Sequence, residues 1–475
     1  MRKTTSLRKA LFPIIATALI TVSLDYYFRI RPAERKAKQA TYQTLNEAKR
    51  LFEQNRYDDA LQTLRTVPES SRMTLDTYTY ADSYNLEGIS CAQIASTSEK
   101  KAAYLQDAST CFTKSLVLFT PDHYPLEHAR AQLNLGATYS TLAEISNPTT
   151  NLNRAIDYGE QAIKYFTLGA FPLDYAKAEE NIGTCYGQLA HVINSKDNLI
   201  KAVSYYNEAR SVFKGINNAE QYAQVSMNLG SALSDLADYV DAQQYWCQAV
   251  DAYDQALIFY TYETNPDRYS DLKNNIGIGY VETAKYQNSI SYLNECVDIL
   301  THNIDLIDKS KSPIRFAIAY KNLGIAYSYL SQMPGRNART CLNRAVDCFL
   351  IASPILSNTK QTLEYARTKT NLADAYLKLA LNAHNADYAD EAISCLRFSL
   401  ETFNRENYPV DYGRLEYELG EAYKALAALS HGRNDYIYSA IKAYELALAM
   451  FPKNDYPNYY CMVMKGLDGA KQVKR

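Results

Sequence analysis

Six asparagines recur along the chain at an almost constant interval. The interval is 47 residues four times and 49 residues once, and a Leu or Ile follows each asparagine directly. An asparagine side chain offers both hydrogen-bond donors and an acceptor, so a row of them can pair with successive peptide groups of an extended ligand. The row consists of Asn134, Asn181, Asn228, Asn275, Asn322 and Asn371.

Basic residues stand near this row and could add specificity. In three copies of the pattern a basic residue lies four positions before the asparagine, and in the last copy one lies four positions before Glu418, which stands in place of the asparagine. Ile278, Ile318 and Ile325 make the middle copies apolar. This pattern predicts a binding groove for a ligand with an apolar centre and polar flanks. The alternative is that the charged residues are solvated surface and that each asparagine only fixes the stacking of neighbouring helices. The four basic candidates are Arg130, Lys177, Arg367 and Arg414.

Signatures of catalysis or cofactor binding do not occur. The six His include no HExxH pair, and the chain has neither a GxxxxGK[ST] phosphate loop nor a GxSxG elbow. The nine Cys form no CxxC pair, and their scatter is typical of small buried side chains. Lys and Arg (50) nearly balance Asp and Glu (52), which argues against nucleic acid as a partner. We therefore predict no enzyme activity, metal, cofactor or small-molecule substrate.

The asparagine row belongs to a larger repeat that predicts two helices per unit. A Gly lies two residues after most of the asparagines, an aromatic eight residues before that Gly, and in most copies a Tyr three after it. These positions share one face of a helix, which we name helix A. A Pro eleven residues before the Gly favours the start of that helix. It is present as Pro125, Pro172, Pro266, Pro313 and Pro409.

The second helix, helix B, shows a small–large–small spacing on one face. Cys296, Cys348 and Cys395 fall on this helix and are expected to be buried. The sets include Ala155-Gly159-Ala162, Ala202-Tyr206-Ala209, Ala242-Trp246-Ala249, Ser289-Leu293-Cys296, Ala338-Leu342-Ala345, Ala392-Leu396-Ser399 and Ala440-Tyr444-Ala447.

These positions resemble the tetratricopeptide repeat (TPR), in the long form found in kinesin light chains and bacterial relatives. Leu323-Gly324-x-x-Tyr327 matches the first helix of that family and Ala202-x3-Tyr206-x2-Ala209 the second, and the resemblance covers roughly residues 41–470. It implies an all-α fold, a right-handed superhelical solenoid of stacked helix–turn–helix units. It also implies that helix A lines the concave face and that the asparagines point into the groove.

The N-terminal residues predict a membrane anchor. Residues 10–24 carry no charge, and with Tyr26, Tyr27 and Phe28 the segment is long enough to cross a bilayer between basic flanks. A removed signal peptide is the alternative, but no small-x-small cleavage site follows the run. The side of the membrane stays open, because the short basic N-terminal tail and the unpaired Cys point to opposite orientations.

The sequence thus predicts four segments. They are an uncleaved anchor over residues 1–28, a basic linker over 29–40, about nine TPR units over 41–455 and a capping helix over 456–475. The predicted function is a membrane-anchored scaffold that binds an extended or helical protein segment in its groove and contacts lipid through residues 10–28. The alternative is a rigid spacer or self-associating solenoid whose groove has no ligand.

Overall fold

The computed structural model describes residues 31–287, 289–430 and 434–473, and its regular elements there are helices. The chain divides into two compact units, Met1–Gln221 and Tyr222–Arg475, which we describe separately. The helices of the first unit are α2 (Arg31–Glu53), α3 (Tyr57–Arg65), α4 (Glu69–Arg72), α5 (Thr77–Ala95), α6 (Lys101–Leu118), α7 (Pro125–Ala143), α8 (Pro148–Ile163), α9 (Pro172–Ala190) and α10 (Ser195–Gly215).

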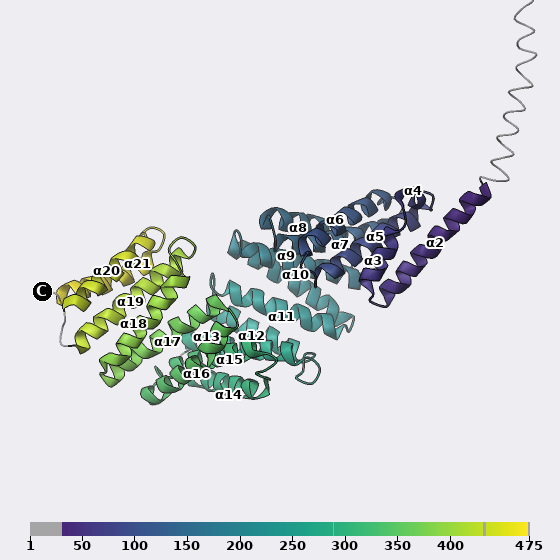
Figure 1. The fold of residues 1–475 in the computed structure, drawn as a ribbon. Helices are drawn as coiled ribbons and strands as arrows, with labels where there is room; N and C mark the ends of the chain where they lie inside the picture. The colour runs from purple at the N-terminus through teal and green to yellow at the C-terminus, as the bar shows by residue number, and fades with distance from the viewer. Residues whose placement is uncertain (1–30, 288, 431–433, 474–475) are drawn as a thin grey trace, which may run out of the picture. The chain divides into compact units, whose positions relative to one another are not determined.

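The second unit continues the same pattern (Figure 1). The unit boundary falls inside α11 (Ala219–Leu236). The following helices are α12 (Ala242–Leu257), α13 (Pro266–Gln287), α14 (Ile290–Leu306), α15 (Pro313–Leu330), α16 (Ala338–Asn358), α17 (Thr362–Ala383), α18 (Ala386–Thr402), α19 (Pro409–Leu429), α20 (Asn434–Met450) and α21 (Pro457–Val473).

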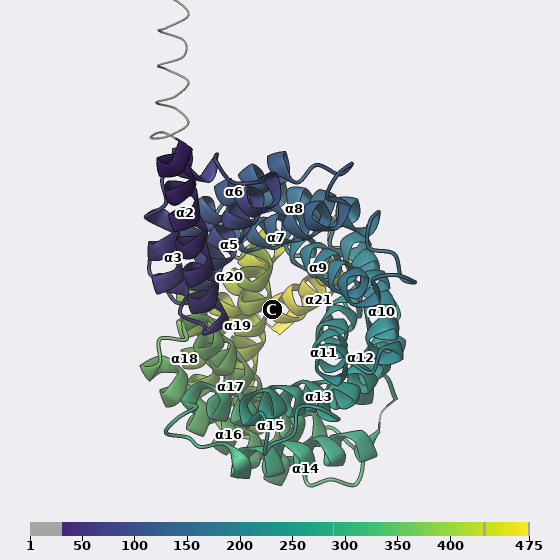
Figure 2. The ribbon, with the colours of Figure 1, turned by 90° about the vertical axis from the view of Figure 1, so that its right-hand side faces the viewer.

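From α5 to α20, odd-numbered helices correspond to helix A and even-numbered helices to helix B. Within each unit the A helices form one face of the row and the B helices the other (Figure 2). The predicted starts of helix A are confirmed, because α7, α9, α13, α15 and α19 all begin at the proline. Proline has no N–H to donate and its φ already suits a helix, so the first turn accepts it without loss.

The repeated tyrosines pack helix A against helix B. Four A-helix tyrosines stack on a tyrosine of the following B helix, with ring centroids 5.6–6.0 Å apart. Such offset ring contacts add to the area that the rings bury. The excess of tyrosine (42 residues) is therefore in part repeated packing. The stacked pairs are Tyr139–Tyr158, Tyr186–Tyr205, Tyr280–Tyr292 and Tyr376–Tyr388.

The predicted register of helix B is wrong in three units. The side chains that lie against Gly230, Gly277 and Gly324 are those of Tyr253, Leu300 and Phe349. Each stands seven residues after the large residue that the sequence pattern predicted. These B helices begin 10 or 11 residues before the residue that packs on the Gly, as α10 does before Tyr206, so the predicted sets lie about two turns too early in each helix. A shift of seven residues returns to the same helix face, which is why the pattern did not distinguish the two registers. The packing sets are therefore Ala249-Tyr253-Ala256, Cys296-Leu300-Asn303 and Ala345-Phe349-Ala352.

Two further predictions, the transmembrane helix and the single-pass membrane localisation, are corrected. Across residues 31–287, 289–430 and 434–473, none of the helices combines the length and the apolar content that crossing a bilayer requires. These helices bury one stripe in the protein and carry charged residues on the rest, as α2 shows with its many Arg, Lys and Glu residues. The predicted membrane-spanning segment, residues 10–28, lies outside the residues that the structure describes. The fold class is accordingly an all-α helical repeat without an assigned membrane helix.

The scattered cysteines are mostly core residues, as expected. Cys296, Cys348 and Cys395 are buried, and burial raises the pKa of the Cys296 and Cys348 thiols to about 12. By contrast, Cys247 and Cys461 are exposed.

Selective labelling should separate these two groups of cysteines. We expect Cys247 and Cys461 to react with a thiol reagent such as iodoacetamide at neutral pH, while the buried thiols stay unmodified until the chain unfolds. Mass spectrometry of labelled native protein checks this. Rapid native labelling of Cys296 would contradict the packing described here.

Candidate partner-binding groove

Four consecutive A helices of the second unit line two adjoining cavities. The larger, about 440 Å³, takes side chains from α13, α15, α17 and α19, and the smaller, about 290 Å³, lies mainly between α15, α17 and α19. Both cavities are lined by Ile325, Thr370, Asn371, Arg414 and Glu418. We name this surface the α15–α19 groove and define it by these five residues.

The structure brings three of the predicted site residues together in this groove. Asn371 lines both cavities, with Arg367 at the smaller and Arg414 at both. Ile325 adds an apolar side chain from the preceding A helix, and Leu415 adds one from the following A helix. The groove therefore combines an amide, cations and apolar surface.

Ion pairs hold several charged side chains of the groove wall in place. Lys378 Nζ lies 2.6 Å from an Asp374 carboxylate oxygen on the same helix. The Glu364 carboxylate of α17 pairs with two cations. Its oxygens lie 2.6 Å from Lys321 Nζ of α15 and 2.8 Å from Arg367 Nη1. Arg367 is thus already paired, whereas Arg414 is exposed and stands beside Glu418.

Glu418 is a groove residue that the asparagine pattern missed. It occupies the asparagine position of its repeat, two residues before Gly420. Burial raises the pKa of its carboxyl to about 7, and the positive charge of Arg414 limits that rise. Its place in the repeat was visible in the sequence, but its acidic type removed it from a search for amides.

The first unit also has two cavities that are lined in part by A helices. Asn134 lines a cavity of about 410 Å³ between α5, α6 and α7, and Asn181 lines one of about 280 Å³ between α7, α8 and α9. Ala137 and Thr141 of α7, and Glu144 directly after it, line both cavities. Asparagines of the row thus line cavities in both units.

The asparagines nevertheless differ in their contacts. Asn134 Nδ2 donates to Asn85 Oδ1 at 3.1 Å and so joins two A helices. Asn228 Oδ1 accepts from Gln224 Nε2 at 3.2 Å within one helix. Asn322 is buried, with 3 % of its surface exposed, while Asn275 is half-buried. None of Asn228, Asn275 and Asn322 lines the four cavities described above.

The two basic candidates of the first unit lie apart from these cavities. Arg130 is exposed and lies 3.7 Å from an Asp174 carboxylate oxygen. Lys177 is also exposed, and neither residue lines the cavities at Asn134 and Asn181. Within the described residues, His, Cys, Asp and Glu side chains do not gather in groups of three or more that could hold a metal ion.

Solved structures similar to this chain are TPR-like helical repeat proteins. RapI in its apo form is 13 % identical, with a TM-score of 0.42, over 69 % of this chain and 100 % of that one. The apo form of the quorum sensor NprR from B. thuringiensis is 14 % identical, with a TM-score of 0.43. The match covers 80 % of this chain and 95 % of NprR. A STAND protein with a TPR sensor from Pyrococcus horikoshii is 15 % identical, with a TM-score of 0.46. The match covers 83 % of this chain and 55 % of that protein.

The helices of this chain fit a TPR-type repeat. The paired helices, the Leu-Gly-x-x-Tyr stripe and the close approach of helix B at each Gly carry this assignment. The resemblance expected from the sequence is thus confirmed for the fold. No protein-family model matches the chain, and no curated protein matches it.

Proposed function

We propose that this chain is a protein-interaction scaffold that binds a peptide segment of a partner in the α15–α19 groove. The observation that carries the proposal is that α13, α15, α17 and α19 contribute to adjoining cavities which share Asn371. Grooves that bind peptides combine apolar surface with a few polar groups that fix orientation. No reaction is part of this proposal.

The groove side chains indicate what the peptide should contain. Asn371 can donate to one peptide carbonyl and accept from one peptide N–H. Arg414 is exposed and suits a carboxylate of the ligand, while Ile325 and Leu415 suit an apolar side chain. We therefore expect an extended or helical segment with an apolar centre and an acidic flank.

Replacing Asn371 by alanine should weaken peptide binding without changing stability. A neutral hydrogen bond contributes about 0.5–1.5 kcal/mol, which corresponds to roughly a two- to tenfold loss of affinity. The measurement is fluorescence anisotropy with a peptide selected against the intact chain from a random display library. Thermal unfolding of the same variant reports its stability.

Asn322→Ala is the matched control for this experiment. Asn322 has the same place in its repeat, but it is buried and does not line the cavities of the groove. Its replacement should leave peptide affinity unchanged. Equal affinities for the wild type and Asn371→Ala would reject a ligand-binding role for Asn371.

A second candidate function is a rigid spacer or self-associating array. The contact between Asn134 and Asn85 favours it, because there an amide of the row joins two helices of the protein itself. Sedimentation of the intact chain distinguishes the two functions. A concentration-dependent dimer that selected peptides do not dissociate favours self-association, whereas a monomer that binds those peptides favours the scaffold.

A further inference from the structure

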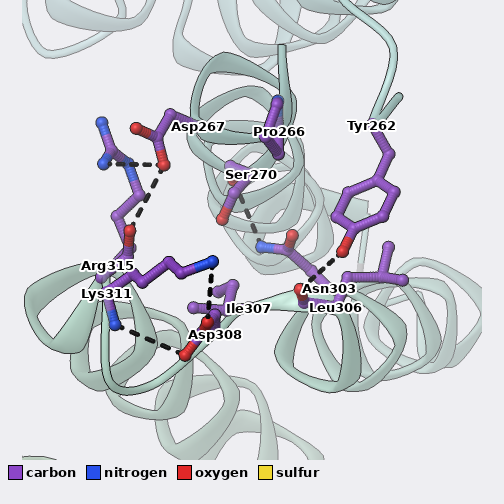
Figure 3. A pocket seen from close by; sticks show the side chains of 11 residues that line it. Tyr262, Pro266, Asp267, Ser270, Asn303, Leu306, Ile307, Asp308, Lys311 and Arg315 are labelled. Atoms are coloured by element: carbon purple, nitrogen blue, oxygen red, sulfur yellow. Dashed lines mark hydrogen bonds and ion pairs between the residues drawn. The ribbon is translucent and has the colours of Figure 1, made fainter. Parts of the chain in front are cut away.

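Most carboxylates that line the cavities of this protein have a cation beside them. A separate cavity of about 450 Å³, between α13, α14 and the connection into α15, shows this clearly (Figure 3). There an Asp267 oxygen lies 3.1 Å from Arg315 Nη1, and an Asp308 oxygen lies 3.5 Å from Lys311 Nζ. Glu418 of the α15–α19 groove differs, because it makes no hydrogen bond or ion pair within the part of the chain that the structure describes.

Glu418 occupies a position that is an asparagine in six other units. It is half-buried and lines both groove cavities, and its carboxylate oxygens keep accessible surface there. A protonated carboxyl has a hydrogen-bond donor and an acceptor, as an amide has, whereas an ionised carboxylate can only accept. Glu418 therefore matches the chemistry of the asparagine row only while it holds a proton.

The charged side chains that line the groove cavities from α13, α15 and α17 are already paired. On α17, Lys378 Nζ lies 2.6 Å from an Asp374 carboxylate oxygen. The other pairs are Lys285–Glu282 on α13, Lys321–Glu364 between α15 and α17, and Arg367–Glu364 on α17.

On α19 itself, Arg414 and Asp411 line a cavity together with Glu418. Among the described residues, no charged side chain of α18, α20 or α21 lines either groove cavity, and Arg414 has no ion-pair partner. Arg414 is exposed and is thus the cation left to bind a ligand carboxylate.

A carboxylate bound by Arg414 would also lie close to Glu418. The two residues are four apart on α19, a spacing that makes them neighbours on the helix surface. Burial raises the pKa of the Glu418 carboxyl to about 7; Arg414 opposes this rise, Asp374 adds to it and Lys378 opposes it. Glu418 can therefore exchange its proton near neutral pH, at the place where the ligand carboxylate binds.

We propose that Glu418 is the specificity-determining residue of the groove. With its proton, the carboxyl donates a hydrogen bond to a ligand carboxylate held by Arg414. Without the proton, its negative charge repels that carboxylate. The groove therefore binds an acidic segment at slightly acidic pH and releases it as the pH rises. This inference rests on the groove function proposed above and adds the group that controls it.

The test is fluorescence anisotropy of the intact chain with a peptide at pH 6 and pH 8 and constant ionic strength. The probe is a rhodamine-labelled peptide amide, selected at pH 6 from a display library that fixes one Asp and excludes His. A carboxyl with a pKa of about 7 is mostly protonated at pH 6 and mostly ionised at pH 8. We therefore expect affinity to fall about five- to tenfold between these two values. The same peptide with Asn in place of its Asp should bind with little dependence on pH.

Glu418→Gln removes the titrating group and keeps a donor and an acceptor. For this variant we expect the affinities at pH 6 and pH 8 to be nearly equal. Glu401→Gln is the matched control, because Glu401 is exposed on α18 and lines neither groove cavity, so the pH dependence should stay that of the wild type. A peptide library that yields no binder at either pH rejects the groove function and this inference with it. Binding that is equal at both pH values, or a pH dependence that survives in Glu418→Gln, rejects only the role of Glu418.

Thermal unfolding without peptide measures the titration of Glu418 separately. The folded carboxyl keeps its proton up to a pKa of about 7, whereas the unfolded chain releases it near the usual pKa of 4.5. Stability from this group is therefore lost as the pH rises between these two values. Glu418→Gln has no such loss, so its melting temperature relative to the wild type should increase from pH 5 to pH 8. A difference that stays constant over this range would overturn the proposal.

Discussion

Replacing Glu87 by alanine should lower the free energy of unfolding of the first unit by about 3–5 kcal/mol. Arg72 is 4 % exposed, and its Nη1 lies 2.8 Å from a Glu87 carboxylate oxygen. Its Nη2 donates to the main-chain oxygen of Leu64 at 2.7 Å, and the guanidinium lies 5.0 Å from the centre of the Tyr84 ring. Without Glu87 the positive charge stays buried and loses its ion-pair partner, which is the costliest way to break an ion pair.

Chemical denaturation followed by circular dichroism measures this loss. Glu47→Ala is the matched control, because Glu47 pairs with Arg50 at 2.6 Å on an exposed helix surface. Exposed ion pairs contribute little to stability, because water and salt screen them, so this control should stay close to the wild type. Replacing Arg72 and Glu87 together by Met and Leu should recover much of the lost stability, since no buried charge remains. Equal losses in Glu87→Ala and Glu47→Ala would show that Arg72 is not held as described.

The fold could be predicted largely because one packing contact repeats. The Leu-Gly-x-x-Tyr stripe of helix A and the proline at its start depend on neighbouring residues, so the sequence shows them directly. The register of helix B could not be read in the same way. Residues seven apart lie on the same face, and only the contacts of Tyr253, Leu300 and Phe349 with glycines of helix A decide between the two registers.

The candidate sites were predicted less well because a repeat pattern hides its exceptions. The row of asparagines led to Asn371, but it treated the buried Asn322 as equivalent. Glu418 departs from the asparagine that its position has in most units. A search for departures from the repeat would have found Glu418, although not the cavities that it lines. Those cavities depend on the side chains that α13, α15 and α17 place beside it, which the repeat period does not specify.

Adding a single methyl group at Gly230 should destabilise the second unit by about 1–3 kcal/mol. A Cβ atom at this position would lie 2.6 Å from Tyr253 Cε1 and 2.7 Å from Cδ1, closer than carbon atoms approach in proteins. Tyr253 is 3 % exposed, so its ring can move away only by displacing the core around it. Alanine favours a helix over glycine by up to about 1 kcal/mol, so a net loss of stability means that the clash outweighs this gain.

The control for Gly230→Ala is Gly187→Ala, also inside an A helix. A Cβ atom at Gly187 would meet only the hydroxyl of Tyr206, at 3.7 Å, which is an ordinary contact. This variant should therefore be as stable as the wild type, or more stable, because it gains helix propensity without a clash. Trp246, the one tryptophan of the chain, lies in the second unit, and its fluorescence follows the unfolding of that unit in Gly230→Ala. Circular dichroism follows Gly187→Ala in the first unit. Opposite changes in the two variants would show that the repeated glycine is required by the approach of helix B, whereas equal changes would show that only helix propensity matters.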